Sequence, residues 1–165
     1  MGKKIQKSMS DIDLEKSNES INKTLRDYKE KIDDQKKGEL DLSNYKVTKP
    51  WGHELWLELN QFYAYKVIHM KKGNQSSLQM HDMKIEANYV IDGEAEVLLE
   101  NDVGELKSHI FPKGSGWVVP RKRKHRVIAK TDYTALEVST PHLDDVVRFE
   151  DDTNRNSGKI DNEHN

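Results

Sequence analysis

Four side chains with metal-binding donor atoms lie in two short stretches: Gln79, His81 and Glu86 in the first, and His125 in the second. In a β-strand, residues two positions apart point to the same face, so Gln79 and His81 would project together. Oxygen and imidazole donors in this mixture suit a borderline divalent cation and leave positions open for water or substrate. Any one of these residues alone fits an ordinary loop or surface role, but the spacing of all four indicates a metal centre.

Two ionisable residues, Lys66 and Glu137, each stand between apolar neighbours in a predicted strand. Facing inward, Lys66 could serve as an acid, a base or a phosphate partner, and Glu137 as a general base. Facing outward, both would be ordinary polar residues on a strand with one solvated face. The sequence favours neither orientation.

The one dense basic run of the sequence directly precedes His125. Because neighbouring residues of a strand alternate between faces, Arg126 should point away from His125. We therefore expect Arg121, Arg123 and Lys124, in the preceding loop, to meet a phosphate group at the mouth of the site. A solvated turn is the competing interpretation, and a weak nucleic-acid patch is a more distant one.

The composition bounds the class of protein. The chain has 165 residues, a net charge of -2, no cysteine, and 34% hydrophobic against 34% charged residues. This length accommodates one domain with an additional arm, and the small net charge argues against nucleic-acid or membrane partners. Without cysteine there are no disulfides or thiolate ligands. No apolar run has the length of a membrane span, and the start has no signal-peptide pattern, so we expect a cytoplasmic protein.

Residues 1–42 form a compositionally distinct arm, which we expect to be helical and partly disordered. An apolar stripe predicts a helix over about residues 13–36, and its members are Leu14, Asn18, Ile21, Leu25, Tyr28 and Ile32. Two such helices could pair as a short coiled coil, with Asn18 setting the register. Alternatively, the helix docks on its own domain.

From Tyr45 onward the pattern changes to short apolar or alternating runs separated by turn residues. The expected strands are 53–59, 63–70, 77–80, 86–91, 95–100, 106–111, 116–119, 125–129 and 135–139. Asp92-Gly93 predicts a hairpin turn, and residues 101–104 predict a loop. Many short strands without intervening helices predict an all-β sandwich or barrel over residues 45–150, the jelly roll included. We expect residues 151–165 to be a disordered tail.

The spacing of the proposed ligands resembles the cupin signature. The positions that match its two motifs are Gly73, Gln79, His81, Glu86 and Gly93, followed by Gly114, Pro120 and His125. Two positions depart, because Lys122 replaces a usual glycine and Ala129 replaces the closing asparagine. The resemblance implies a double-stranded β-helix, the cupin jelly-roll barrel.

Within the cupins, about residues 47–155 resemble the isomerase domain of type II mannose-6-phosphate isomerases. The strings that carry the resemblance are Lys49-Pro50-Trp51-Gly52, Ser77-Leu78-Gln79-Met80-His81 and Asp144-Asp145-Val146-Val147-Arg148-Phe149-Glu150-Asp151. The family's usual Tyr-Gly-Arg appears here as Thr153-Asn154-Arg155, which keeps the arginine and loses the glycine.

This resemblance implies Gln79, His81, Glu86 and His125 as ligands of one divalent metal, Zn in the first place, with Mn, Co, Fe or Ni as alternatives. It also implies Arg155 as a phosphate contact. The expected reaction is aldose–ketose isomerisation of a sugar phosphate through an enediol, serving GDP-mannose or polysaccharide biosynthesis. The alternatives are a non-catalytic sugar or sugar-nucleotide binding module and, less favoured because of Gln79, a metal-dependent oxygenase. Cupins often dimerise, so a homodimer is expected.

Overall fold

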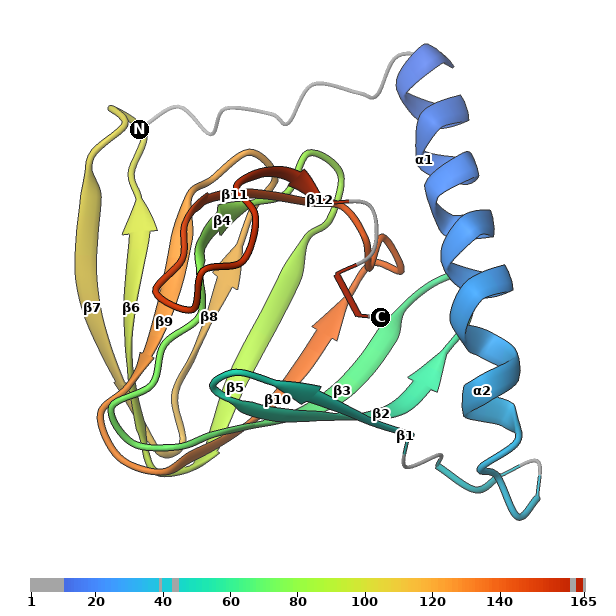
Figure 1. The fold of residues 1–165 in the computed structure, drawn as a ribbon, viewed down its shortest axis with the longest axis horizontal. Coiled ribbons are helices and arrows are strands. Elements are labelled where there is room, and N and C mark those ends of the chain that lie inside the picture. The colour runs from blue at the N-terminus through green and yellow to red at the C-terminus, as the bar shows by residue number, and fades with distance from the viewer. Residues whose placement is uncertain (1–10, 39, 43–44, 161–162, 165) are drawn as a thin grey trace.

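Two six-stranded antiparallel sheets face each other in the computed structural model, which describes residues 11–38, 40–42, 45–160 and 163–164 (Figure 1). The first sheet runs in the order β1 (Tyr45–Lys49), β2 (Gly52–Leu59), β3 (Ala64–Met70), β10 (Tyr133–Ser139), β5 (Glu86–Asp92) and β8 (Gly116–Val119). The second runs in the order β12 (Gly158–Ile160), β11 (Val146–Glu150), β4 (Leu78–Met80), β9 (His125–Ala129), β6 (Glu94–Glu100) and β7 (Leu106–Pro112). This is the predicted all-β jelly roll.

Strand alternation divides the interior into an ionisable middle and two apolar clusters. Along β3, for example, Ala64, Lys66, Ile68 and Met70 are all buried, while the residues between them are partly exposed. Ile68 and Met70 belong to one apolar cluster with Trp51 and Trp117, whereas Ala64 belongs to a second one with Trp56. Lys66 lies between the two clusters, in a layer of charged side chains. The three tryptophans are all buried and fill core space.

The predicted Asp92-Gly93 hairpin is wrong. β5 pairs with β10 and β8 in the first sheet, and β6 pairs with β7 and β9 in the second, so the chain crosses between sheets at this point. Gly93 makes the corner with a φ of +78°, and a Cβ atom there would lie 2.2 Å from the backbone oxygen of Asp132. Hairpin and corner both need a residue with positive φ, so the local sequence does not distinguish them.

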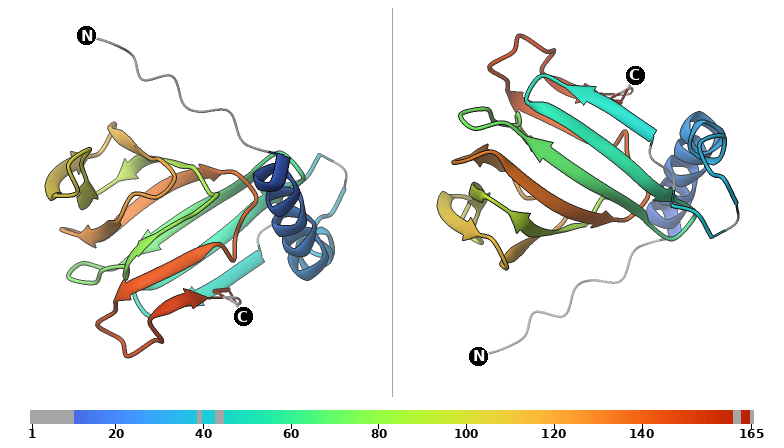
Figure 2. Two further views of the ribbon diagram at one scale, coloured as in Figure 1. Left: turned by 90° about the horizontal axis from the view of Figure 1, so that it is seen from above. Right: turned by 90° about the horizontal axis from the view of Figure 1, so that it is seen from below.

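A helical segment lies along one side of the barrel (Figures 1 and 2). It consists of α1 (Asp11–Thr24), a π-helical turn η1 (Leu25–Lys29) and α2 (Glu30–Asp33). Tyr28 and Ile32 are fully buried in the cluster that contains Trp56 and Leu143, whereas Asn18 is exposed. The helix therefore docks on its own barrel, the alternative to coiled-coil pairing. In the part of the chain that is described, no helix has the length and apolar character needed to cross a bilayer.

The expectation of a disordered tail over residues 151–165 needs correction. β12 pairs with β11, with Val146 opposite Ile160, and Glu163 and His164 occupy defined positions inside the molecule. Residues 161, 162 and 165 lie outside the described part, as do residues 1–10 of the arm. Part of the polar composition that suggested disorder is accommodated by ion pairs, because Glu163 pairs with buried Arg148 and with Arg155.

Candidate metal centre and its cavity

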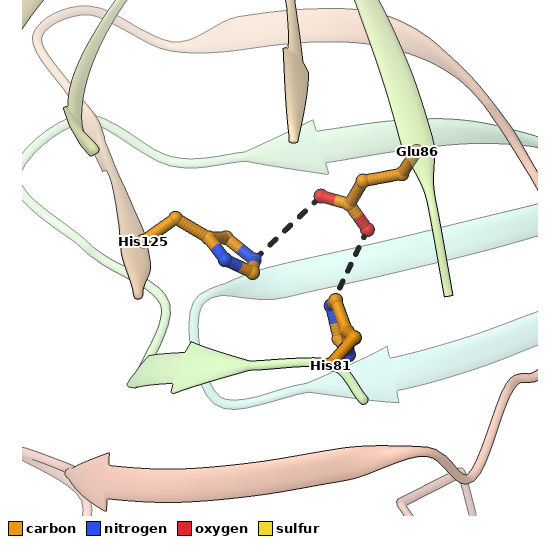
Figure 3. Close-up of side chains that lie close together, drawn as sticks. All are labelled: His81, Glu86 and His125. Atoms are coloured by element: carbon orange, nitrogen blue, oxygen red, sulfur yellow. Dashed lines mark ion pairs between the residues drawn. The ribbon is translucent and has the colours of Figure 1, made fainter. Parts of the chain in front are cut away.

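Three strand ends bring the predicted imidazole and carboxylate ligands together. His81 directly follows β4, Glu86 begins β5, and His125 begins β9 (Figure 3). His81 Nε2 lies 3.6 Å from Glu86 Oε2, and His125 Nε2 lies 3.7 Å from Glu86 Oε1. One donor atom from each of the three residues lies within 4.8 Å of the other two. All three side chains are buried.

The two imidazole rings are oriented from behind by backbone carbonyls. His81 Nδ1 donates to the oxygen of Asp145 at 2.6 Å, and His125 Nδ1 donates to that of Arg123 at 3.0 Å. Because a carbonyl oxygen only accepts, each ring carries its proton on Nδ1 and turns the Nε2 lone pair toward Glu86. Both Nε2 atoms are buried and lack a hydrogen-bond partner among the described residues. Burial also lowers the pKa of His125 to about 4, which keeps it neutral. This donor set fits a divalent cation.

Gln79 completes the predicted set by its position in β4. It is paired with His125 across the β4–β9 ladder, so the two side chains share one face of the sheet. Its Oε1 accepts a hydrogen bond from Ser77 Oγ at 2.9 Å, and the side chain lines the same cavity as the histidines. Its role as a ligand stays a prediction.

Charged groups of alternating sign continue from the ligand Glu86 into the barrel. Lys84 Nζ donates to Glu86 Oε2 at 2.6 Å and to Glu137 Oε1 at 3.2 Å. Lys66 Nζ lies 3.9 Å from Glu137 Oε1 and donates to Glu54 Oε2 at 3.0 Å. Lys66 and Glu137 thus face the interior, the first of the two orientations considered for them. Their part in proton transfer stays a prediction.

The pKa values of Glu86 and Lys84 are both shifted toward the charged forms. Burial alone would raise the pKa of Glu86, but Lys84 holds it well below its usual range. Burial would likewise lower the pKa of Lys84, yet Glu137 and Glu86 raise it above the ordinary lysine value. Lys84 is therefore a permanent cation between the two carboxylates.

The candidate metal ligands and the charged network line one cavity. Its lining includes Gln79, His81, Lys84, Glu86, His125, Lys66, Glu137, Arg155, Glu163 and His164. These side chains are charged or polar, which suits a small polar ligand.

Residues 35–151 match the family described as mannose-6-phosphate isomerase C-terminal. The chain belongs to the mannose-6-phosphate isomerase C-terminal family. It is 32% identical over 111 residues to the xanthan biosynthesis protein XanB of Xanthomonas campestris, covering 64% of this chain and 23% of that protein. It is 34% identical over 110 residues to the mannose-1-phosphate guanylyltransferase ManC of Salmonella typhimurium, covering 64% and 22%. The chain thus spans under a quarter of the length of these relatives.

The fold comparison agrees with the cupin signature. An RmlC-like cupin from Shewanella frigidimarina superposes with a TM-score of 0.52 at 20% sequence identity, covering 64% of this chain and 88% of that chain. The barrel of this family member is therefore a cupin, as its two motifs implied.

One of the substrate-binding residues expected from the sequence lines the cavity, and three lie elsewhere. Arg155 is at the cavity wall, whereas Arg121, Arg123 and Lys124 are not among its lining residues. The Arg123 guanidinium contacts the backbone oxygen of Asn101 and the carboxylate of Asp102. Lys124 Nζ lies 3.8 Å from Glu100 and over the ring of Phe149. The expected placement of Arg123 and Lys124 is corrected, because Asp102 and Glu100 at the β6–β7 loop hold these two side chains away from the cavity.

Lys122, which replaces a glycine of the cupin motif, keeps the conformation that the glycine would have. Its φ is +56°, in the left-handed region, and its amide donates to the oxygen of His81 at 2.7 Å. A non-glycine residue in this conformation costs about 1–2 kcal/mol. The departure from the motif therefore leaves the turn beside His125 in place.

Two residues of the site were missed by sequence reasoning. Lys84 precedes Glu86 by two positions, the spacing that puts side chains on one face of a strand, and this signal was available. Asp145 positions the turn after β4, since its carboxylate accepts the amides of Met83 at 2.6 Å and Lys84 at 2.9 Å. Its own carbonyl orients His81. Nothing local marks Asp145 for this role, because its partners lie about sixty residues away in the chain.

Proposed function

We propose that the chain is a metal-dependent isomerase that interconverts an aldose phosphate and a ketose phosphate of the mannose-6-phosphate type, in GDP-mannose or polysaccharide biosynthesis. The observation that carries the proposal is a pair of buried, partnerless Nε2 atoms facing Glu86, in a cavity that also presents Glu137 and Lys66. The family description and the xanthan biosynthesis relative support the substrate class and the pathway.

His81, Glu86 and His125, with Gln79 as a fourth donor, would hold the metal. Zn is the first expectation, and Mn, Co, Fe or Ni also suit nitrogen and oxygen donors. A bound cation would supply Lewis acidity to the sugar carbonyl. A neutral amide at position 79 would leave the cation more electron-poor than a second carboxylate would.

Glu137 is the proposed base. Its carboxylate would remove the proton from C2 of the aldose and return it to C1, passing through the enediol. Lys84 holds this carboxylate by the 3.2 Å contact and remains protonated, so it positions the base and offsets negative charge as it develops. Lys66, on the other side of Glu137, would donate a proton to the C1 oxygen as the enediol forms and take up the proton of the C2 hydroxyl as the enediol becomes the ketose. A binding module would require none of these groups.

The test is interconversion of mannose 6-phosphate and fructose 6-phosphate by purified protein supplied with Zn, Mn, Co or Fe. We expect turnover that Glu137→Gln abolishes while metal content stays equal to that of the wild type. Glu105→Gln, which alters an exposed glutamate beside Lys107, is the matched control and should retain activity. No turnover with any metal, together with sugar binding that is lost in His81→Ala, would favour the binding module. Oxygen consumption would instead favour the oxygenase.

A further inference from the structure

The carboxylate of Glu163 is held by cations from three separate segments. Its Oε1 accepts from Lys49 Nζ at 3.3 Å and from Arg155 at 3.4 Å, and its Oε2 accepts from Arg148. Lys49 also donates to the backbone oxygen of Glu163 at 2.8 Å. Lys49 lies in β1, Arg148 in β11, and Arg155 in the loop between β11 and β12. We call Lys49, Arg148 and Arg155 the cation cluster.

The cation cluster is buried and depends on Glu163 for charge compensation. The side chains of Lys49 and Arg148 are only 5% and 3% exposed. Arg148 has one further interaction, a donation to the oxygen of Asn156, and its buried Nε has no hydrogen-bond partner in the described ranges. Desolvated cations without a counter-ion are strongly destabilising. This cluster therefore requires an anion, whether from the chain or from a ligand.

The neighbouring acidic groups do not replace that anion. Arg155 is paired with Asp151 through Nε and one terminal nitrogen, which leaves its other terminal nitrogen for Glu163. Glu54 lies 4.0 Å from Lys49 but is already bonded to Lys66 and Trp56. Arg148 is thus left with Glu163 as its carboxylate partner among the described residues.

The cation cluster meets the cavity of the candidate metal ligands through Arg155 and Glu163, whereas Lys49 and Arg148 do not line this cavity and contact Glu163, which does. Arg155, Glu163 and His164 line this cavity together with His81 and His125. His164 is packed edge-on against the Trp56 ring at 4.8 Å, and its Nε2 donates to the oxygen of Leu143 at 3.0 Å. Residues after β12 therefore fill one end of the space in which a substrate would have to bind.

We propose that Lys49, Arg148 and Arg155 form the binding site for the phosphoryl group of the substrate, and that Glu163 occupies this site as an internal competitor. Two guanidinium groups and an ammonium match the several oxygens of a phosphate monoester better than those of one carboxylate. Because Arg155 is already paired with Asp151, a dianion would mainly offset Lys49 and Arg148, and it would do so more fully than a single negative charge does. The inference rests on the proposed function for the identity of the sugar phosphate, but the anion site itself does not depend on turnover.

The probe is inorganic phosphate, titrated calorimetrically into metal-loaded full-length chain at constant ionic strength. Neutralising Glu163 should raise the fraction of molecules in which the cation cluster is free to bind phosphate. We therefore expect Glu163→Gln to bind phosphate about tenfold more tightly than the wild type. Glu105→Gln removes the same charge far from the site and should match the wild type. Equal phosphate affinities in the wild type, Glu163→Gln and Glu105→Gln would overturn the proposal that Glu163 competes with phosphate for this site.

The site itself is tested in the Glu163→Gln background. Arg148→Gln should remove phosphate binding, and if that buried change prevents folding, as judged by circular dichroism, the less buried Arg155→Gln should weaken binding at least severalfold. Unchanged phosphate affinity in the folded variants would overturn the proposed site. Phosphate binding that follows this pattern without sugar-phosphate turnover would sink the proposed isomerase and leave this inference standing. Turnover with a KM for mannose 6-phosphate that Glu163→Gln and Arg155→Gln leave unchanged would overturn this inference and leave the proposed isomerase standing.

Discussion

The candidate metal-ligand cluster and the cation cluster around Glu163 are two groups of mostly buried charged or polar side chains that reach one cavity, the second through Arg155 and Glu163, but they differ in what they lack. At the first, two imidazole Nε2 atoms face a carboxylate and have no hydrogen-bond partner among the described residues. At the second, three cations surround a carboxylate that the chain itself supplies. The first arrangement leaves two donor atoms available to a cation, whereas the charges of the second are already offset by Glu163.

Two adjacent residues of the β10–β11 connection serve these two regions separately. Asp145 supports the metal centre through His81 and the turn that follows it. Asp144 accepts hydrogen bonds from the Tyr28 hydroxyl of the helix and from the amide of Glu163. Candidate ligands with free donor atoms need hydrogen bonds that fix their orientation, as the Asp145 carbonyl provides for His81. The segment that carries Glu163 needs a contact that holds it in place, as Asp144 provides. The comparison leads to four predictions.

The largest effect is expected at the open cluster. The double change His81→Ala, His125→Ala should reduce bound divalent metal to background and abolish any isomerase activity, because it removes both imidazole donors. Metal content by elemental analysis after dialysis provides the measurement. His109→Ala, on the exposed strand β7, is the control and should keep full metal content. Equal metal content in the double variant and the wild type would show that the site is wrongly assigned.

The adjacent aspartates should separate the two regions. Asp145→Ala is expected to weaken metal affinity about tenfold or more, as loss of a group that positions a ligand typically does. Asp144→Ala should leave metal affinity unchanged and lower the free energy of unfolding by about 1–3 kcal/mol, since buried donors lose their acceptor. Competition with a metal-binding dye and urea denaturation measure the two quantities. Identical profiles for both variants would mean that the regions are not independent.

A smaller effect concerns pH. Burial lowers the pKa of His142 to about 4, and its ring bonds to Ser17 of the helix and to Thr140. The unfolded chain takes up this proton near pH 6.5, whereas the folded protein resists it until about pH 4, so this contribution to stability is complete above 6.5 and declines as the pH falls. Urea midpoints at pH 7.5 and pH 5 should therefore differ less in His142→Asn than in the wild type. An unchanged difference contradicts the prediction.

The smallest effect is expected for the basic run outside both clusters. Because Arg123 is paired with Asp102 and is not among the cavity-lining residues, Arg123→Ala should change KM for a sugar phosphate by less than about twofold, within the range of an ordinary surface substitution. Arg155→Ala, at the cavity wall, is the comparison and should raise KM clearly. A larger change in KM for Arg123→Ala than for Arg155→Ala would support the basic run before His125 as the phosphate contact.

Much of the barrel was predictable because strand formation here depends on local patterning. The expected strands over residues 116–119 and 125–129 coincide with β8 and β9, and the other expected strands differ from the structure by one or two residues at their ends. Strands β1, β11 and β12 were missed, although β1 alternates Tyr45 and Val47 with polar residues. The Asp92-Gly93 turn shows the limit of local signals, because positive φ at Gly93 serves a hairpin and a crossing between sheets equally well.

The sequence by itself determined the cupin barrel and its candidate ligands, because motif spacing places Gln79, His81, Glu86 and His125 on strand ends that this fold brings together. The tertiary structure alone decided that Lys66 and Glu137 face inward, that Arg123 and Lys124 pair with acidic groups at the β6–β7 loop, and that Glu163 lines the cavity. The physical reason is that these choices depend on partners far away in the chain. Lys66 meets Glu54 across a sheet, Arg123 meets Asp102, and Glu163 meets Arg148 only after folding.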